Sequence, residues 1–171
     1  MRKKRERAQA GVRLPDGDLN GYTLLLLGRE YTLRVQEREG VGFDQATGQI
    51  FLPAREAEKR LVQWLKENAK QIFTRITEEQ AKRMGVRYRS VGVSSAKTRW
   101  GSCSADDRLR YSFRLLYAPK EVIEYVVVHE LAHTRYKNHS RLFWAEVEKY
   151  LPDWKIQRKW LKAHGALMEI F

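Results

Sequence analysis

The sequence predicts an α+β fold, in which N-terminal β-hairpins and a helix precede a small sheet, a central helix and two C-terminal helices. Two observations predict this order. Runs rich in strand-forming residues, bounded by turn residues, occupy residues 22–52 and recur between residues 86 and 116. Apolar residues at helical spacings of three and four occupy residues 54–84 and the chain that follows Pro119.

The size and composition are those of one compact domain. The chain has 171 residues, and its 43% of hydrophobic and 32% of charged residues suffice for a core. No apolar run is long enough to cross a bilayer, and no signal-peptide segment follows the basic N-terminus. We therefore expect a cytoplasmic location without a membrane partner. The single cysteine, Cys103, cannot form an internal disulfide, which agrees with a reducing compartment.

The N-terminal part predicts a basic arm followed by two hairpins. Residues 1–18 combine dense charge with Gly and Pro and show no periodicity, which is typical of a tail or a loosely attached arm. Residues 22–27 and 31–35 are rich in strand formers around a Gly-containing loop, and they predict the first hairpin. Residues 41–52 predict a second hairpin, which ends at Pro53 because proline cannot donate to a strand ladder.

The middle of the chain predicts helix and then strand. Residues 54–76 have apolar residues at helical spacing with charged residues between them, so we expect a helix that packs on the hairpins. A second helical piece over residues 77–84 ends at Gly85. Residues 86–94 and 108–116 then predict two strands around an intervening turn.

Three helices are expected in the last third of the chain. Pro119 suits the first turn of a helix, where its missing N–H would be unbonded in any case. Ser140 is placed to cap a helix over residues 141–150, and Asp153 to cap the last one, which ends near Gly165. The apolar side of that last helix is predicted to consist of Ile156, Trp160, Ala163 and Leu167.

The first of these three helices carries the pattern His129-Glu130-Leu131-Ala132-His133, a metal-binding motif. On a helix the two histidines lie one turn apart on the same face, so both imidazoles can bind one ion. The glutamate follows the first ligand and points toward the place of a water held by that ion. Three of the four histidines of the chain fall between positions 129 and 139, which favours a metal site over an ordinary amphipathic helix.

The third metal ligand is expected just after the motif. A catalytic zinc ion usually takes three protein ligands, and His139 is the expected donor, with Glu146 as the alternative of a two-His-plus-Glu site. The spacing from His133 to His139 is that of the metzincin pattern, but Tyr136 occupies the glycine position. The chain must therefore reach His139 by a longer helical turn or a loop. Zinc is the default ion, and another divalent metal such as Ni²⁺ is the alternative.

Several motifs of the chain together resemble the YgjP-like metallopeptidase family and, more distantly, the SprT-like proteases. They are Arg99-Trp-Gly-Ser-Cys-Ser104, the Pro-started helix with its His-Glu-Leu-Ala-His motif, Asn138-His-Ser140 with Phe143-Trp144, and Pro152-Asp153. The resemblance covers about residues 85–165. It implies a zincin-like fold whose small sheet packs on the motif helix, a metal held by His129, His133 and His139, and Glu130 as the catalytic base.

Residues 99–104 are also a candidate wall of the substrate cleft. Gly101 beside Trp100 would let a strand approach a ligand closely, and Arg99 and Ser102 are further candidates for substrate contacts. The alternative is a strand end with a buried Trp and no chemistry. Cys103 is not expected to act as a nucleophile, because nothing in the sequence indicates a lowered thiol pKa. By residue type alone, Arg99, Tyr111 and Tyr136 are candidates for stabilising an oxyanion.

The leading functional hypothesis is a zinc-dependent metallopeptidase acting on a peptide or protein substrate. The first alternative is a metal-dependent hydrolase of nucleotides or other phosphoanhydrides, since a net charge of +12 attracts phosphates. The lack of a Gly-rich phosphate loop counts against this alternative. The other alternative is a basic nucleic-acid-binding module with a structural metal, but such sites normally have four ligands and many cysteines.

These segments divide the chain into three predicted parts. Residues 1–18 form the arm, residues 19–84 the hairpins and helices, and residues 85–171 the metal-binding catalytic region. The parts from residue 19 onward are expected to form one compact unit, because the chain is of single-domain size.

Overall fold

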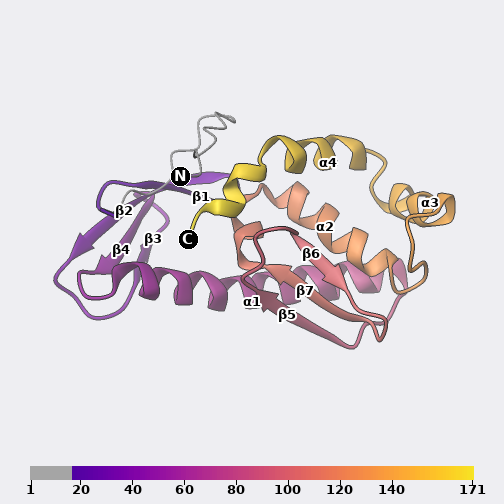
Figure 1. Cartoon of the computed structure of the whole chain (residues 1–171), viewed down its shortest axis with the longest axis horizontal. Helices are drawn as coiled ribbons and strands as arrows, with labels where there is room; N and C mark the ends of the chain where they lie inside the picture. Colours follow the sequence, from indigo (N-terminus) through magenta and orange to yellow (C-terminus); the bar gives the residue numbers. More distant parts are fainter. Residues whose placement is uncertain (1–16) are drawn as a thin grey trace, which may run out of the picture.

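The computed structural model describes residues 17–171, in which two small sheets lie along one long helix (Figure 1). The predicted arm, residues 1–18, falls outside the described residues except for its last two. The predicted α+β class is confirmed, with strands and a helix ahead of a second sheet and the C-terminal helices. No helix of the described part is both long and apolar enough to span a bilayer.

The first sheet contains both predicted hairpins. Its strands are β1 (Thr23–Leu26), β2 (Arg29–Gln36), β3 (Gly42–Asp44) and β4 (Gln49–Pro53), in the order β1-β2-β4-β3. The turn between β1 and β2 consists of Leu27 and Gly28, with φ of 52° and 79°, the left-handed conformation that two-residue hairpin turns use. The hairpins are antiparallel, as expected, but β2 and β4 pair in parallel and merge them into one sheet.

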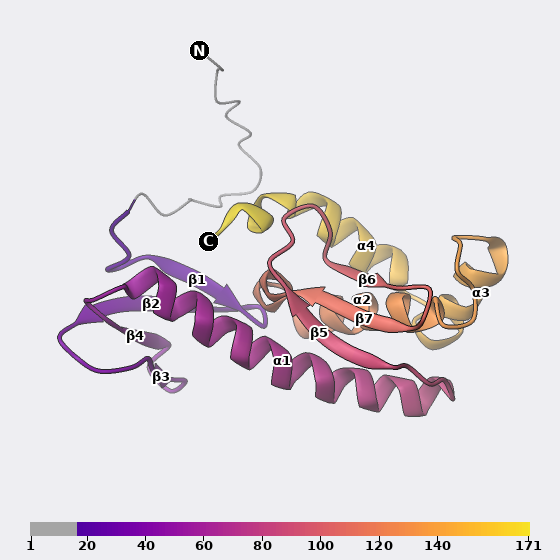
Figure 2. The same cartoon turned by 60° about the horizontal axis from the view of Figure 1, so that its bottom comes forward.

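Helix α1 (Ala57–Met84) is one continuous helix of 28 residues, so the expected break near residue 76 is wrong. Its apolar stripe continues through Ile76, Ala81 and Met84, and the stripe packs without interruption from the first sheet to the second. Figure 2 shows the helix running past both sheets. Gly85 ends it with φ of 63°, as predicted, and its N–H bonds to the last-turn carbonyls.

The second sheet consists of β5 (Ser90–Ser94), β6 (Gly101–Cys103) and β7 (Arg108–Ser112), in the order β5-β7-β6. Strand β6 pairs antiparallel with β7, and β5 pairs with β7 in parallel. The strand predicted over residues 108–116 is too long, because Phe113–Tyr117 forms the 3₁₀-helix η1, whose five residues are all buried. A short run that is buried on all sides has no polar and apolar alternation, so its sequence does not distinguish a strand from a helix.

Three helices follow, as predicted, and the 3₁₀-helix η2 (Gly165–Glu169) ends the chain. They are α2 (Lys120–Ala132), α3 (Arg141–Tyr150) and α4 (Trp154–Ala163). The Ser140 hydroxyl accepts a hydrogen bond from the Phe143 N–H, which confirms the predicted cap of α3. The Asp153 side chain makes no such bond at α4.

The predicted apolar side of α4 is wrong at two of its four residues, whereas Trp160 packs half-buried against the core, as expected. Ile156 is 66% exposed and Ala163 is also exposed, whereas Trp154 is buried. The Trp154 ring stacks on Trp144 of α3 at 4.3 Å between centroids, and this contact sets how the helix is rotated about its axis. Leu167 is buried as expected, but it belongs to η2.

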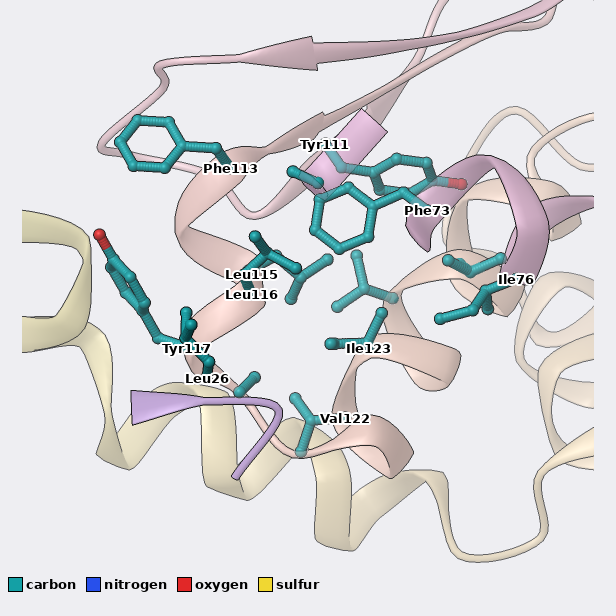
Figure 3. Packing of buried hydrophobic residues seen from close by; sticks show 14 of the residues in the cluster. Leu26, Phe73, Ile76, Tyr111, Phe113, Leu115, Leu116, Tyr117, Val122 and Ile123 are labelled. Atoms are coloured by element: carbon teal, nitrogen blue, oxygen red, sulfur yellow. The ribbon is translucent and has the colours of Figure 1, made fainter. Parts of the chain in front are cut away.

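The core positions α2 at the centre of the molecule. Figure 3 shows Phe73 of α1, Tyr111 of β7 and Ile123 of α2 packed together with η1. Helix α2 buries residues on every side, which is typical of a central helix and leaves only its ends for chemistry. The second sheet contacts α2 through β6.

Candidate metal centre

The three histidines of the predicted site meet at the C-terminal end of α2. His129 lies in its last turn, His133 directly follows it, and His139 comes from the loop before α3. Their ligand atoms lie within 4.8 Å of one another, and Nε2 of His129 is 3.2 Å from Nε2 of His139. Zn–N bonds of about 2.0–2.1 Å at tetrahedral angles would place neighbouring nitrogens about 3.3 Å apart, so the donor set fits one zinc ion.

The path from His133 to His139 combines the two routes that the sequence left open. The Tyr136 N–H bonds to the Ala132 carbonyl at 3.0 Å, which adds one helical turn, and a bend at residues 137–138 follows. The Lys137 ammonium contacts the Asp107 carboxylate on the turn between β6 and β7. This ion pair ties the ligand-bearing loop to the second sheet.

Two tyrosines hold the imidazoles in orientation, a role that was not predicted from the sequence. Nδ1 of His133 donates to the Tyr136 carbonyl at 2.8 Å, which leaves Nε2 free to bind a metal. The Tyr125 hydroxyl lies 3.5 Å from Nδ1 of His129. Tyr125 precedes His129 by four residues on α2, so helical spacing was the available signal.

Aromatic side chains from α3 wall the same site. The Phe143 ring stacks on His133 at 4.4 Å between centroids, and the Trp144 ring lies over His139 at 5.8 Å. Both aromatic residues lie in the first turn of α3, whose start is set by the Ser140 cap. From the sequence, Phe143 and Trp144 were noted only among the motifs that resemble the family, without a predicted role at the metal site.

The structure does not bring Glu146 to the histidines. Its carboxylate is 2.6 Å from the Arg135 guanidinium, which also donates to the Met84 carbonyl at the end of α1. Among the described residues, the group able to hold a metal is the three histidines alone. Glu146 therefore joins α3 to α1 through Arg135.

Two of the three histidines, His129 and His133, are held in the neutral form that binds metals. Burial, the two neighbouring imidazoles and the Arg158 guanidinium lower the pKa of His129 to about 3. Burial also lowers the pKa of His133, although its bond to the Tyr136 carbonyl acts in the opposite direction. Near neutral pH the imidazoles of His129 and His133 therefore need not lose a proton before they bind an ion.

Glu130 is buried next to the histidines, with 6% of its surface exposed. Burial raises the pKa of its carboxyl to about 7, and the charge of Arg99 opposes this rise. The carboxylate faces β6, because a Cβ added to Gly101 would lie 3.2 Å from Oε1 of Glu130. The structure thus places Arg99 and Gly101, two of the predicted substrate-lining residues, beside Glu130.

The other candidates from the sequence have different surroundings. Trp100 and Ser102 are half-buried on either side of Gly101. The Tyr111 hydroxyl lies 3.2 Å from that of Thr77 and is fully buried, so it is not available to a substrate. Burial raises the pKa of Cys103 to about 11 although the Lys137 charge acts in the opposite direction, which agrees with the expectation that this thiol is not a nucleophile.

The raised pKa of Glu130 predicts that Glu130→Gln stabilises the metal-free protein at neutral pH. Below pH 4.5 the carboxyl is protonated in the folded and unfolded states, and they do not differ. As the pH rises to 7, the Glu130 carboxyl ionises first in the unfolded state. The wild type therefore loses up to about 3 kcal/mol of its free energy of unfolding, whereas Glu130→Gln, which has no carboxyl at this position, does not. Urea unfolding with chelator at pH 4 and pH 8 measures this, and an equal difference at both pH values would contradict it.

Gly101→Ala is expected to lower the stability and the activity together. The new Cβ would lie 3.0 Å from Cγ1 of Val126 and 3.1 Å from Cγ of Glu130, so β6 would have to move away from α2. Overpacking of this kind costs about 1–3 kcal/mol. Gly165→Ala is the matched control, because no atom lies within 4 Å of its added Cβ. Thermal unfolding of both variants checks this, and equal losses would contradict the close approach.

Comparison with known proteins decides the family. The family model of the YgjP-like metallopeptidase domain matches residues 1–164. The chain belongs to this family. YgjP-like membership makes it a metal-dependent peptidase domain, a hydrolase of peptides or proteins, and its elements have the predicted α+β arrangement.

Two solved structures are similar to this YgjP-like chain. The metallopeptidase zymogen abylysin of Pyrococcus abyssi is 23% identical and covers 54% of this chain and 94% of its own, with a TM-score of 0.49. The metallopeptidase zymogen jannalysin of Methanocaldococcus jannaschii is 22% identical and covers 56% and 96%, with a TM-score of 0.47. No curated protein matches the sequence.

Proposed function

We propose that the chain hydrolyses peptide bonds with one zinc ion held by His129, His133 and His139 and with Glu130 as the general base. The observation that carries the proposal is the meeting of three imidazoles beside a buried carboxylate in a metallopeptidase family member. Three protein nitrogens leave a fourth tetrahedral position open, as in catalytic zinc sites. Another divalent ion such as Ni²⁺ also suits imidazole donors.

In this mechanism, the chain supplies the proton transfers. When bound, zinc polarises the scissile carbonyl and makes a water acidic. The Glu130 carboxylate accepts a proton from the water while the water oxygen attacks the carbonyl carbon of the peptide. The resulting carboxylic acid then donates this proton to the amine nitrogen as the C–N bond breaks. In the metal-free protein, burial raises the pKa of this carboxyl to about 7, and a pKa near the operating pH suits a group that takes up and releases a proton.

The second sheet is the proposed guide for the substrate. Strand β6 lies at the edge of that sheet and contacts α2, so an extended peptide can add to it through main-chain hydrogen bonds. Such a peptide would run past Glu130, with Arg99, Trp100, Gly101 and Ser102 as its wall. The charge of Arg99 acts on the Glu130 carboxylate and lowers its pKa.

The family assignment favours peptide hydrolysis over the nucleotide hydrolase and the nucleic-acid-binding module. A three-histidine donor set is typical of catalytic rather than structural zinc. The boundary between an N-terminal part, residues 19–84, and a catalytic region, residues 85–171, remains part of the proposal. So does a cytoplasmic location of the protein. One hydrophobic cluster extends from Leu19 to Ile170 and supports a single unit from residue 19 onward.

The test of this function is a paired assay of the purified full chain. Peptide libraries and nucleoside triphosphates are incubated with the protein as isolated, with chelator, and after zinc or nickel is restored. We expect peptide cleavage that chelator removes and zinc restores, together with about one zinc per chain by elemental analysis. Cleavage of triphosphates without cleavage of any peptide would refute the proposal.

A further inference from the structure

A pocket with one cationic side chain adjoins two of the three histidines. It has a volume of about 430 Å³ and is lined by Tyr125, His129, His139, Trp144 and Arg158. His129 and His139 connect it to the candidate metal centre. Arg158 comes from α4 and has no part in the proposed proton transfers. The pocket therefore lies where the groups flanking a scissile bond would be bound.

Two tryptophans hold the Arg158 guanidinium in place. Its central carbon lies 5.2 Å from the ring centroid of Trp144 and 5.9 Å from that of Trp154. The two indoles stack on each other at 4.3 Å with 18° between their planes, so they form one rigid platform. A cation over an aromatic face is attracted to it, and the planar head is thereby oriented before any ligand arrives.

Within the described part of the chain, no ion pair neutralises the Arg158 charge. Among residues 17–171 no carboxylate pairs with Arg158, and the side chain is exposed. Arg135, which lies at the start of the ligand-bearing loop, is by contrast paired with Glu146 at 2.6 Å. An oriented guanidinium without a partner, at the wall of a pocket, is available to a ligand that carries negative charge.

We propose that Arg158 binds a carboxylate of the peptide substrate, so that the pocket selects peptides with a negative charge close to the scissile bond. The guanidinium fork matches the two oxygens of a carboxylate. One cation also balances one carboxylate charge, whereas a phosphate dianion would need further donors. The carboxylate comes either from the C-terminus of the peptide or from an acidic side chain. The place of the pocket in catalysis rests on the proposed peptidase function, but carboxylate binding does not.

The test measures binding to the full chain in the presence of chelator, so that no turnover is required. The probes are acetyl-Ala-Ala with a free C-terminus or a C-terminal amide, and acetyl-Ala-Glu amide against acetyl-Ala-Gln amide. The chain has five tryptophans, and the Arg158 guanidinium lies over two of them, Trp144 and Trp154. The indole N–H signals of these two residues in NMR spectra therefore report binding of a probe at Arg158. We expect at least one carboxylate probe to bind about tenfold more tightly than its amide.

Three variants separate the guanidinium from general charge. Arg158→Gln is expected to remove the tenfold preference, and Arg158→Lys to keep part of it, because the charge stays while the fork is lost. Lys159→Gln is the matched control, since this exposed neighbour on α4 does not line the pocket and should change binding less than twofold. Circular dichroism verifies that each variant is folded.

The outcomes decide both the pocket and the source of the carboxylate. Preference for the free C-terminus identifies the α-carboxylate, and preference for Glu over Gln identifies an acidic side chain. Equal binding of carboxylates and amides, equal effects of Arg158→Gln and Lys159→Gln, or tighter binding of inorganic phosphate than of either carboxylate would overturn the proposal. Carboxylate binding without cleavage of any peptide after zinc is restored would instead refute the peptidase function alone.

Discussion

Glu130→Gln is expected to abolish peptide hydrolysis while zinc stays bound. Glutamine keeps the size of the side chain but cannot accept the proton of the attacking water, and loss of a general base costs about 10²- to 10⁴-fold in rate. Among the described residues, the group that could hold the ion consists of the three histidines without this carboxylate. Values of kcat/KM on the best library peptide, measured together with zinc content, test this expectation.

The control for this variant lies on the same helix. Glu121 is exposed in the first turn of α2, so Glu121→Gln removes one carboxylate at the other end of the helix from the histidines and should leave kcat/KM unchanged. Activity of Glu130→Gln within a few-fold of the wild type would remove Glu130 from the mechanism. Loss of zinc from Glu130→Gln would make it a ligand rather than a base.

His139→Ala is expected to weaken zinc binding at least tenfold, whereas Glu146→Gln leaves it nearly unchanged. His139 offers a nitrogen 3.2 Å from that of His129, so its removal opens a second coordination position. The Glu146 carboxylate instead lies against Arg135 at 2.6 Å. Competition for zinc with a chromophoric chelator measures both affinities.

His129→Ala and His133→Ala complete this series, and each should lower zinc content and activity together. Stoichiometric zinc at unchanged affinity in either variant would remove that histidine from the site. If Glu146→Gln lost the ion while His139→Ala retained it, the site would be of the two-His-plus-Glu class. The ion pair of Glu146 with Arg135 would then have to break before metal binds.

The local pattern of the sequence determined most of the elements. A hairpin with Gly28 in its turn, the end of α1 at Gly85 and the cap of α3 at Ser140 were predictable, because each depends on the conformational preference of a few neighbouring residues. The turn itself lies one residue earlier than predicted, at Leu27-Gly28, and Arg29 and Glu30 belong to β2. The two motif histidines were predictable in the same way. Four residues apart on a helix, His129 and His133 must share a face whatever surrounds them.

Only the tertiary structure decided what lies around those histidines. The parallel pairing of β5 with β7, the ion pair of Glu146 and the approach of Gly101 to Glu130 join residues that are far apart in the chain. The rotation of α4, which places Arg158 over two indoles, follows from the stacking of Trp154 on α3. Periodicity in the sequence indicates which face of an element is apolar. The segment that packs against this face is decided by contacts between distant parts of the chain, and no local pattern contains that information.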